Sequence, residues 1–168
     1  MTKLLVFSDS HGCAGHMLRA IEAEAPDGIV FLGDGERDLH EVMRRFPNLP
    51  VKSVRGNVDG QSAAPLLLRD TIEGKRVFAV HGHEYNVKYG GGIQRLCYAA
   101  MEADADIVLF GHTHAPYSDR YLGMDILNPG SIGSNARPTY GVVTIADGAV
   151  ATRIKAAPQA EPDGRRRE

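Results

Sequence analysis

The sequence predicts an α/β fold in which two mixed β-sheets pack face to face with helices outside them. Two observations lead to this prediction. The first half of the chain alternates short apolar runs with amphipathic helical segments, and the second half contains strand-like segments joined by glycine-containing turns. The length of 168 residues and the hydrophobic content of 43% suit one globular domain with its own core.

The first half predicts a strand–helix–strand–helix–strand unit with right-handed crossovers. Its strands are short, apolar and rich in β-branched or aromatic residues, as buried parallel strands are. Its two helices show apolar residues at helical spacing, and prolines follow both of them. The predicted strands are Leu4–Ser8, Ile29–Leu32 and Val51–Val54, and the predicted helices are His16–Glu24 and Asp38–Phe46.

The second half predicts mostly antiparallel strands and one helix. Glu73-Gly74-Lys75 separates two strand-like runs and is typical of a hairpin turn. Ile93–Ala103 has the spacing of an amphipathic helix. The predicted strands are Leu66–Ile72, Val77–Val80, Ile107–Phe110, Tyr117–Leu122, Met124–Leu127, Gly141–Ile145 and Val150–Ile154.

Composition and charge narrow the class of protein. The formal net charge of −2 gives no overall field that would attract nucleic acid or an anionic membrane. No segment approaches the roughly 18 apolar residues of a membrane span. Cys13 and Cys97 lie in unrelated contexts, so two thiols in a reducing cytosol are expected, with a single disulfide as the alternative. A cytoplasmic protein is therefore expected.

The domain is expected to occupy residues 1–156. Residues 157–168 are expected to form a disordered tail, because they include Pro162 and Gly164 and almost no apolar residue. The arginines at 165–167 could bind a polyanion, but neighbouring acidic residues offset their charge, which favours a solvated tail.

Side chains that bind metals follow several predicted strands. Asp9 and His11 come after the first strand, Asp34 after the second and Asn57 after the third. An i, i+2 pair on an extended segment faces one side, so Asp9 and His11 can reach the same ion. Each feature alone has an ordinary explanation, because Gly-Asp and Gly-Asn are common turn pairs and aspartate often caps a helix.

Four of the seven histidines fall in two short glycine-bounded clusters, and this is harder to explain by turns alone. These are His81 with His83, and His112 with His114. Imidazole is the commonest neutral metal ligand in proteins. Together with the carboxylates and the amide they supply enough ligands for two divalent ions, and such a pair of ions can clamp both oxygens of a phosphoryl displacement. Oxygen and nitrogen ligands without thiolate suit Mn, Fe, Zn, Ni or Co.

These segments, taken in order, resemble the calcineurin-like metallophosphoesterase superfamily. Its pattern is Asp-x-His, Gly-Asp, Gly-Asn, a glycine-flanked His and Gly-His-x-His. Asn128-Pro129-Gly130-Ser131 is similar to the small prokaryotic phosphodiesterase branch of the YfcE type. The resemblance covers roughly residues 4 to 154 and implies a metallophosphoesterase domain with a four-layer α/β/β/α sandwich of two mixed β-sheets flanked by helices.

The resemblance also implies a ligand set for two divalent ions, of which manganese is the first expectation. A metal-bound hydroxide would then be the nucleophile in hydrolysis of a phosphoester. Asp34 would bridge the ions. One ion would be held by Asp9, His11, Asp34 and His114, and the other by Asp34, Asn57, His81 and His112.

The expected catalytic residues are Asn57, Asp59 and His83. Many superfamily members carry a histidine directly after the Gly-Asn asparagine, where it assists the leaving group, but Val58 stands there in this chain. Asp59 is better explained as a hydrogen-bond acceptor behind the ligands than as the missing acid. His83 either supports the ligands or contacts substrate, and the alternative is a histidine that points away from the site.

The resemblance implies a phosphodiesterase rather than a monoesterase, acting on a small molecule rather than nucleic acid. The alternative is a non-catalytic interaction scaffold, since the superfamily includes a retromer subunit of this fold. The complete set of ligand positions favours the enzyme. A metal-dependent nuclease has less support, because no basic groove is visible in the composition. A homodimer or homotetramer is plausible from the resemblance.

Overall fold

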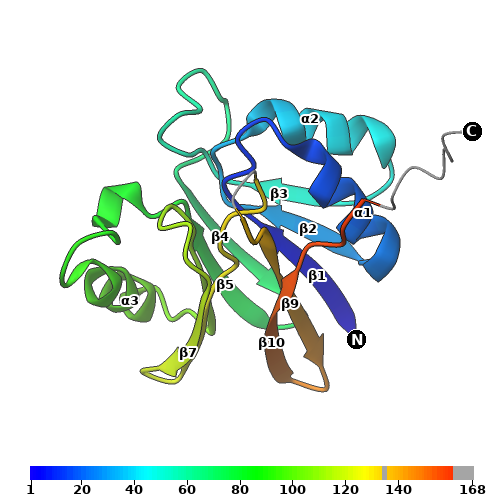
Figure 1. Ribbon diagram of the computed structural model, residues 1–168. Coiled ribbons are helices and arrows are strands. Elements are labelled where there is room, and N and C mark those ends of the chain that lie inside the picture. Colours follow the sequence, from blue (N-terminus) through cyan, green and yellow to red (C-terminus); the bar gives the residue numbers. More distant parts are fainter. Residues whose placement is uncertain (134–135, 161–168) are drawn as a thin grey trace, which may run out of the picture.

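The computed structural model, which describes residues 1–133 and 136–160, contains two five-stranded mixed sheets flanked by helices (Figure 1). This arrangement confirms the predicted α/β sandwich. The first sheet has the strand order β10-β9-β1-β2-β3 and the second β4-β5-β6-β8-β7. The strands of the first sheet are β1 (Thr2–Phe7), β2 (Gly28–Phe31), β3 (Val51–Ser53), β9 (Thr139–Ala146) and β10 (Ala149–Ala156).

The second sheet and the helices complete the domain. The strands of the second sheet are β4 (Leu67–Ile72), β5 (Lys75–Val80), β6 (Ile107–Leu109), β7 (Tyr117–Tyr121) and β8 (Met124–Asn128). The helices are α1 (Ala14–Glu24), α2 (Glu36–Arg45), α3 (Gly92–Glu102) and a short 3-10 helix, η1 (His83–Tyr85). Within the described ranges, none of these helices has both the length and the hydropathy needed to cross a membrane.

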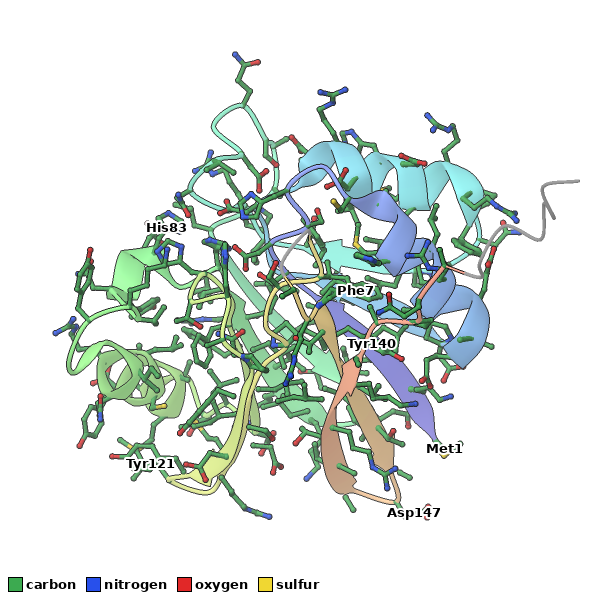
Figure 2. The ribbon with its side chains drawn as sticks, in the orientation of Figure 1. Met1, Phe7, His83, Tyr121, Tyr140 and Asp147 are labelled. Atoms are coloured by element: carbon green, nitrogen blue, oxygen red, sulfur yellow. The ribbon has the colours of Figure 1, made fainter. Side chains whose placement is uncertain are left out.

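Strand β1 is buried on both faces, and alternate side chains serve two different cores. Leu5 and Phe7 pack with residues of α1 and α2, whereas Leu4 and Val6 pack in the layer between the two sheets. Successive side chains of a strand point to opposite faces, which explains the continuous apolar run. Figure 2 shows Phe7 beside Tyr140 of β9, and their ring centroids are 5.9 Å apart.

Strand β5 repeats this division in the second sheet. Val77 and Ala79 face the layer between the sheets, while Phe78 and Val80 pack against residues of α3. The order of layers is therefore helices α1 and α2, the first sheet, the second sheet and helix α3. Figure 1 shows α3 on the side of the molecule away from α1 and α2.

The strand pairing of the second half is mostly antiparallel, as predicted from sequence, and strand β6 is the exception. Strand β6 is parallel to both β5 and β8, and β9 lies in the first sheet, where it pairs antiparallel with β1. The parallel β5–β6 pair follows from helix α3, because a helical crossover returns the chain in the same direction. Hairpins predict pairing between neighbours in sequence, and they carry no information about the β1–β9 pair.

The packed part of the chain continues past the expected boundary at residue 156. Ala157 is buried in the core under α1, and its N–H donates to the carbonyl of Pro138 at 2.8 Å. The carbonyl of Pro158 accepts a hydrogen bond from Arg19 Nε at 3.0 Å. Residues 157 and 158 thus contact the domain, and the part of the predicted tail from residue 161 onward lies outside the described residues.

Candidate metal centre

The seven predicted metal ligands converge where parallel strands of both sheets end. This is the end of an open α/β sheet where ligand groups ordinarily collect. In Figure 2, His83 marks this end, and Tyr121 and Asp147 mark the hairpin turns at the far end. The ligands lie in the loops after five strands: Asp9 and His11 after β1, Asp34 after β2, Asn57 after β3, His81 after β5, and His112 and His114 after β6.

Asp9, His11 and His114 form a first group of possible metal ligands, whose donor atoms lie within 4.8 Å of one another. Asp9 Oδ1 is 3.0 Å from His114 Nε2 and 3.6 Å from His11 Nε2. The two imidazole nitrogens are 3.3 Å apart. Asp9 is buried and both histidines are exposed, so the group opens to solvent on its imidazole side.

Asp34, His81 and His112 form a second group, and Asn57 adjoins it. His81 Nε2 lies at the centre of these four residues. It is 3.0 Å from Asn57 Oδ1, 3.1 Å from His112 Nδ1 and 3.3 Å from Asp34 Oδ2. The second group therefore offers two imidazole nitrogens, one carboxylate oxygen and one amide oxygen.

The Asp34 carboxylate lies between the two groups. Its Oδ2 atom is 3.3 Å from His81 Nε2 in the second group and 3.9 Å from His11 Nε2 in the first. Its other oxygen, Oδ1, accepts the main-chain N–H of Val58 at 3.0 Å. One oxygen is thus fixed by the backbone, and the other is directed toward imidazoles of both groups.

The donor atoms fit divalent cations. Asp9 Oδ1 is fully buried and, among the described residues, has the imidazole nitrogens of the first group nearby but accepts no well-aligned hydrogen bond, which is costly for a buried carboxylate oxygen. Each close pair of imidazole nitrogens, His11 with His114 and His81 with His112, can share at most one proton. A cation between these atoms would satisfy them together. Neither group contains a cysteine, so the donors are oxygen and nitrogen only.

The tautomer of His81 is fixed by the main chain. Its Nδ1 atom donates to the carbonyl of Leu32 at 2.6 Å, so in the neutral imidazole the lone pair is on Nε2, which faces the second group. A hydrogen bond from the far nitrogen is the usual way in which proteins orient a metal-binding imidazole. His112 presents Nδ1 to the second group, so the two histidines use different ring nitrogens.

The charge states of Asp34 and His112 suit metal binding, whereas the His81 ring holds its proton more tightly than a free imidazole and must release it to a metal ion. Burial opposes ionisation of Asp34, but hydrogen bonds from His81 and Val58 N and the nearby imidazole charges outweigh it and lower its pKa to about 2. Burial and the positive charges of His81 and Lys88 lower the pKa of His112 to about 4. Burial lowers the pKa of His81, but the carboxylates of Asp34 and Asp9 outweigh this and raise it.

The ligand loops have an unusual backbone. Asp9, His11, Asp34, His112 and His114 all have positive φ, between 45° and 66°. This left-handed region is uncommon outside glycine, and such residues cluster at functional sites. The extended geometry predicted for Asp9 and His11 is therefore wrong, although their side chains still reach one group. The same backbone at His112 and His114 sends their side chains to different groups.

Two glycines allow the loops to approach one another. A Cβ atom on Gly56 would lie 2.0 Å from Asp34 Oδ1, and one on Gly111 would lie 2.0 Å from Ser8 Oγ. No side chain fits at such distances, so the glycine before Asn57 and the glycine before His112 are required by packing. This explains physically why Gly-Asn and Gly-His pairs occur at these strand ends.

Asp38 supports the first group, although its sequence context predicted only a place in a helix. Asp38 is 7% exposed, and its carboxylate accepts hydrogen bonds from Ser10 Oγ at 2.5 Å and from Gly12 N at 2.8 Å. These bonds hold the loop that carries His11 against α2. A sequence signal existed, because Asp38 shares a helical face with the buried Val42, four residues further on.

The Asn128–Ser131 segment also holds ligand loops in place. Asn128 Nδ2 donates to the carbonyl of Gly111 at 3.0 Å and to Thr113 Oγ1 at 2.9 Å. Ser131 Oγ donates to the carbonyl of Asp9 at 2.8 Å. Both residues are buried, and their side chains hold in position the backbone on either side of His112 and at Asp9.

The three predicted catalytic residues occupy different places. Asn57 adjoins the second group, as described above. Asp59 lies behind the Asp34 turn, where its carboxylate accepts main-chain N–H groups. His83 lies next to the second group, with its ring centroid 5.4 Å from that of His81 and 6.1 Å from that of His112. Its buried Nδ1 has no hydrogen-bond partner within the described ranges, and burial and the charge of His81 lower its pKa.

A pocket of about 680 Å³ opens beside both groups. It is lined by His11 and Asp34, by the first residues of α2, and by residues 58–61. Val58, at the rim, is 61% exposed. The volume falls within the ordinary range for small-molecule sites, and the two shared lining residues connect the pocket to the metal ligands.

The sequence model of the calcineurin-like phosphoesterase superfamily domain matches residues 2–148. This chain belongs to that superfamily. YsnB of Bacillus subtilis, named a probable metallophosphoesterase, is 33% identical to it over 160 residues, covering 90% of this chain and 89% of YsnB. The phosphodiesterase YfcE of Escherichia coli is 30% identical over 156 residues, covering 79% of this chain and 80% of YfcE.

Solved structures agree with the assignment of this metallophosphoesterase chain. The crystal structure of a predicted phosphoesterase from Streptococcus pneumoniae has a TM-score of 0.77 at 26% identity, covering 92% of this chain and 89% of that chain. Vps29 of Entamoeba histolytica, crystallised with Zn²⁺, has a TM-score of 0.72 at 20% identity, covering 92% of this chain and 98% of that one. The likeness to Vps29 shows the shared fold alone.

Proposed function

We propose that this metallophosphoesterase is a dinuclear metal-dependent enzyme that hydrolyses small phosphodiesters. The observation that carries the proposal is the position of Asp34, whose Oδ2 atom lies within 3.9 Å of imidazole nitrogens from both groups. A carboxylate in this position can bridge two cations. The proposed first ion takes Asp9, His11, Asp34 and His114, and the proposed second ion takes Asp34, Asn57, His81 and His112.

Two bound divalent ions would supply Lewis acidity, which activates water as a nucleophile at neutral pH and stabilises charge on phosphoryl oxygens. Manganese is the first candidate, and Fe, Zn, Ni and Co suit the same donors. The chain's own contribution is preorganisation. Leu32, Val58 N and Asp38 fix the orientation of the ligands and their loops before any substrate arrives.

The neighbouring pocket supports a small diester as substrate. A phosphodiester has two esterified alcohols where a monoester has one. The pocket beside His11 and Asp34 can hold the second of them. Val58 cannot transfer a proton to a leaving alkoxide. We propose that His83 contacts the phosphoryl group from the side of the second group, because its ring lies beside His81 and His112.

The alternative function is a non-catalytic scaffold, to which the Vps29 likeness gives a precedent for the fold only. A scaffold has no need of a carboxylate placed between two ligand groups, a main-chain bond that orients a buried imidazole, or a buried carboxylate oxygen that accepts no hydrogen bond. All three features are present in this chain. They favour the enzyme.

The test is hydrolysis of bis(p-nitrophenyl) phosphate and of p-nitrophenyl phosphate by chelated protein to which Mn²⁺ is returned. We expect Mn²⁺ to restore activity and the diester to be the better substrate by kcat/KM. Asp34→Ala should abolish turnover and lower the metal content of both sites, because removal of the bridge leaves two cations facing each other.

Asp147→Asn, in the distant β9–β10 turn, is the matched control and should keep both ions and full turnover. Two ions per chain and normal turnover in Asp34→Ala would show that the bridging assignment is wrong. Absence of metal-stimulated hydrolysis in the unmodified protein would favour the scaffold.

A further inference from the structure

We propose that Asp59 is a positioning residue that holds together the two turns carrying Asp34 and Asn57, and thereby sets the affinity of the second group for its ion. It does not donate a proton in the reaction. The inference rests on the ligand set of the proposed function, but it concerns metal affinity, which is measured without any substrate.

Four main-chain N–H groups donate to the Asp59 carboxylate. Oδ2 accepts from Asp34 N at 2.7 Å and from Gly56 N at 2.9 Å. Oδ1 accepts from Gly35 N at 3.0 Å and from Glu36 N at 3.2 Å. A carboxylate has about four acceptor positions, so this side chain is fully used by the backbone. No oxygen of Asp59 is left to serve a substrate.

These bonds join two segments of the chain that follow different strands. Asp34 and Gly35 lie in the turn between β2 and α2, Glu36 is the first residue of α2, and Gly56 stands directly before Asn57 in the loop after β3. The turns touch closely, since a Cβ on Gly56 would meet Asp34 N at 2.5 Å. The carboxylate of Asp59 therefore fixes the position of Asp34 relative to Asn57.

The Asp34 side chain also accepts a hydrogen bond from the loop that carries Asp59. While Asp59 accepts the N–H of Asp34, the Oδ1 atom of Asp34 accepts the N–H of Val58 at 3.0 Å. The reciprocal pair fixes both the backbone of Asp34 and the rotation of its carboxylate. Rotation matters because it directs Oδ2 toward the imidazoles of both groups.

Asp59 also supplies the cap that α2 lacks. The residue before the helix is Gly35, which has no side chain to accept the first free N–H groups. A carboxylate bonded to Gly35 N and Glu36 N satisfies two of them and interacts favourably with the positive end of the helix dipole. The helix end that would otherwise attract a phosphate is already occupied by an anion of the protein.

The first experiment is Mn²⁺ binding by calorimetry to Asp59→Asn, compared with the unmodified chain, both prepared free of metal. The amide turns an NH₂ group toward N–H donors, so it cannot accept all four bonds. We expect one of the two Mn²⁺ sites, the one formed by the second group, to lose affinity by about 10- to 100-fold, as when partners behind metal ligands are removed. Excess Mn²⁺ should restore kcat.

The second experiment separates positioning from proton donation. For a series of aryl phosphodiesters at saturating Mn²⁺, the slope of log kcat/KM against leaving-group pKa should be the same in Asp59→Asn and in the unmodified enzyme. A general acid would give a steeper slope in the variant and no rescue by metal. Unchanged Mn²⁺ affinity together with a steeper slope overturns the proposal.

Asp106→Asn is the matched control, because Asp106 also accepts a main-chain N–H, from Arg76, at the other end of the strands. It should leave Mn²⁺ affinity unchanged. If Asp59→Asn does not fold, Asp59→Glu keeps the negative charge but displaces the oxygens by one methylene, and it should give a smaller loss of affinity. If Asp59→Asn folds and binds Mn²⁺ as tightly as the unmodified chain does, the proposal is contradicted. This holds whether or not the protein hydrolyses a diester.

Discussion

His81 donates its Nδ1–H to the main-chain carbonyl of Leu32 at 2.6 Å, across the interface between the two sheets. Leu32 follows β2 in the first sheet, and His81 follows β5 in the second. Both residues are buried. One hydrogen bond therefore joins the sheets and, at the same time, fixes the nitrogen that His81 offers to the second group.

This double role predicts that His81→Ala destabilises the metal-free protein. The carbonyl of Leu32 would be left buried without a partner, which costs about 1–3 kcal/mol. His114→Ala should cost far less, because the His114 side chain is 45% exposed. Urea unfolding in the presence of a chelator measures both. Equal stability of the two variants would mean that the Leu32 bond contributes little.

His112→Ala and His114→Ala should affect different ions. His112 Nδ1 lies 3.1 Å from His81 Nε2, whereas His114 Nε2 lies 3.0 Å from Asp9 Oδ1. Crystals of each variant, soaked in Mn²⁺, should each lose occupancy at one site first, and the anomalous signal identifies it. Loss of the same site in both variants contradicts the proposed division of ligands.

Hydrolysis should depend steeply on the pKa of the leaving group. Val58, directly after Asn57, has no proton to donate to a leaving group, and general-acid assistance is typically worth about 10²–10⁴-fold. Aryl diesters should react fast and alkyl diesters slowly, and Val58→His should flatten the dependence. Measurement of kcat/KM over substituted phenyl diesters tests this. A flat dependence in the unmodified enzyme would point to another proton donor, with His83 as the first candidate.

The contacts of Glu24 predict that the folded protein loses stability in acid. Its carboxylate, at the end of α1, forms an ion pair with Lys155 of β10, accepts the hydroxyl of Tyr140 at 3.0 Å and lies 3.6 Å from Lys3 Nζ. The Lys155 contact, opposed by burial and assisted by Tyr140, lowers the pKa of Glu24 below its ordinary value of 4.5. A lowered pKa in the folded state means that the carboxylate stabilises the fold above pH 4.5 and ceases to do so as it protonates.

Glu24→Gln should therefore lower the stability of the metal-free protein at pH 7 by about 1 kcal/mol. The difference from the unmodified chain should shrink as the pH falls below 4.5 and through the lowered pKa. Thermal unfolding over this pH range measures it. Glu22→Gln is the control, because the Glu22 side chain is 53% exposed and pairs only at the surface with Arg45. A difference that does not change with pH would exclude the ionised Glu24 as its source.

Two truncated chains should show that residues 157 and 158 stabilise the domain and that the residues after 158 do not. Removal of everything after Pro158 should leave melting temperature and activity nearly unchanged. Removal of everything after Ala156 should lower the melting temperature by several degrees, because Ala157 is buried and donates to Pro138. A fall of similar size in the longer truncated chain would show that residues after 158 also stabilise the domain.

The sequence by itself determined the elements and the identity of the chemistry-bearing residues. Apolar runs such as Val77–Val80 predict strands, because burial on two faces requires continuous apolar residues. The order of Asp9, Asp34, Asn57, His81 and the His112–His114 pair along the chain was sufficient to predict a metal centre. These signals are local, so they can be found in one sequence.

Only the tertiary structure decided which groups meet. The pairing of β9 with β1 and the bond from His81 to Leu32 join residues far apart in the chain, and no local pattern specifies them. The role of Asp38 is of the same kind, since an aspartate in the first turn of a helix looks ordinary until its partners are known. For Asp59 the sequence predicted an acceptor behind the ligands, and the structure supplied the main-chain groups that donate to it. Ligand identity follows from chemistry that is local in sequence, whereas ligand geometry follows from long-range packing.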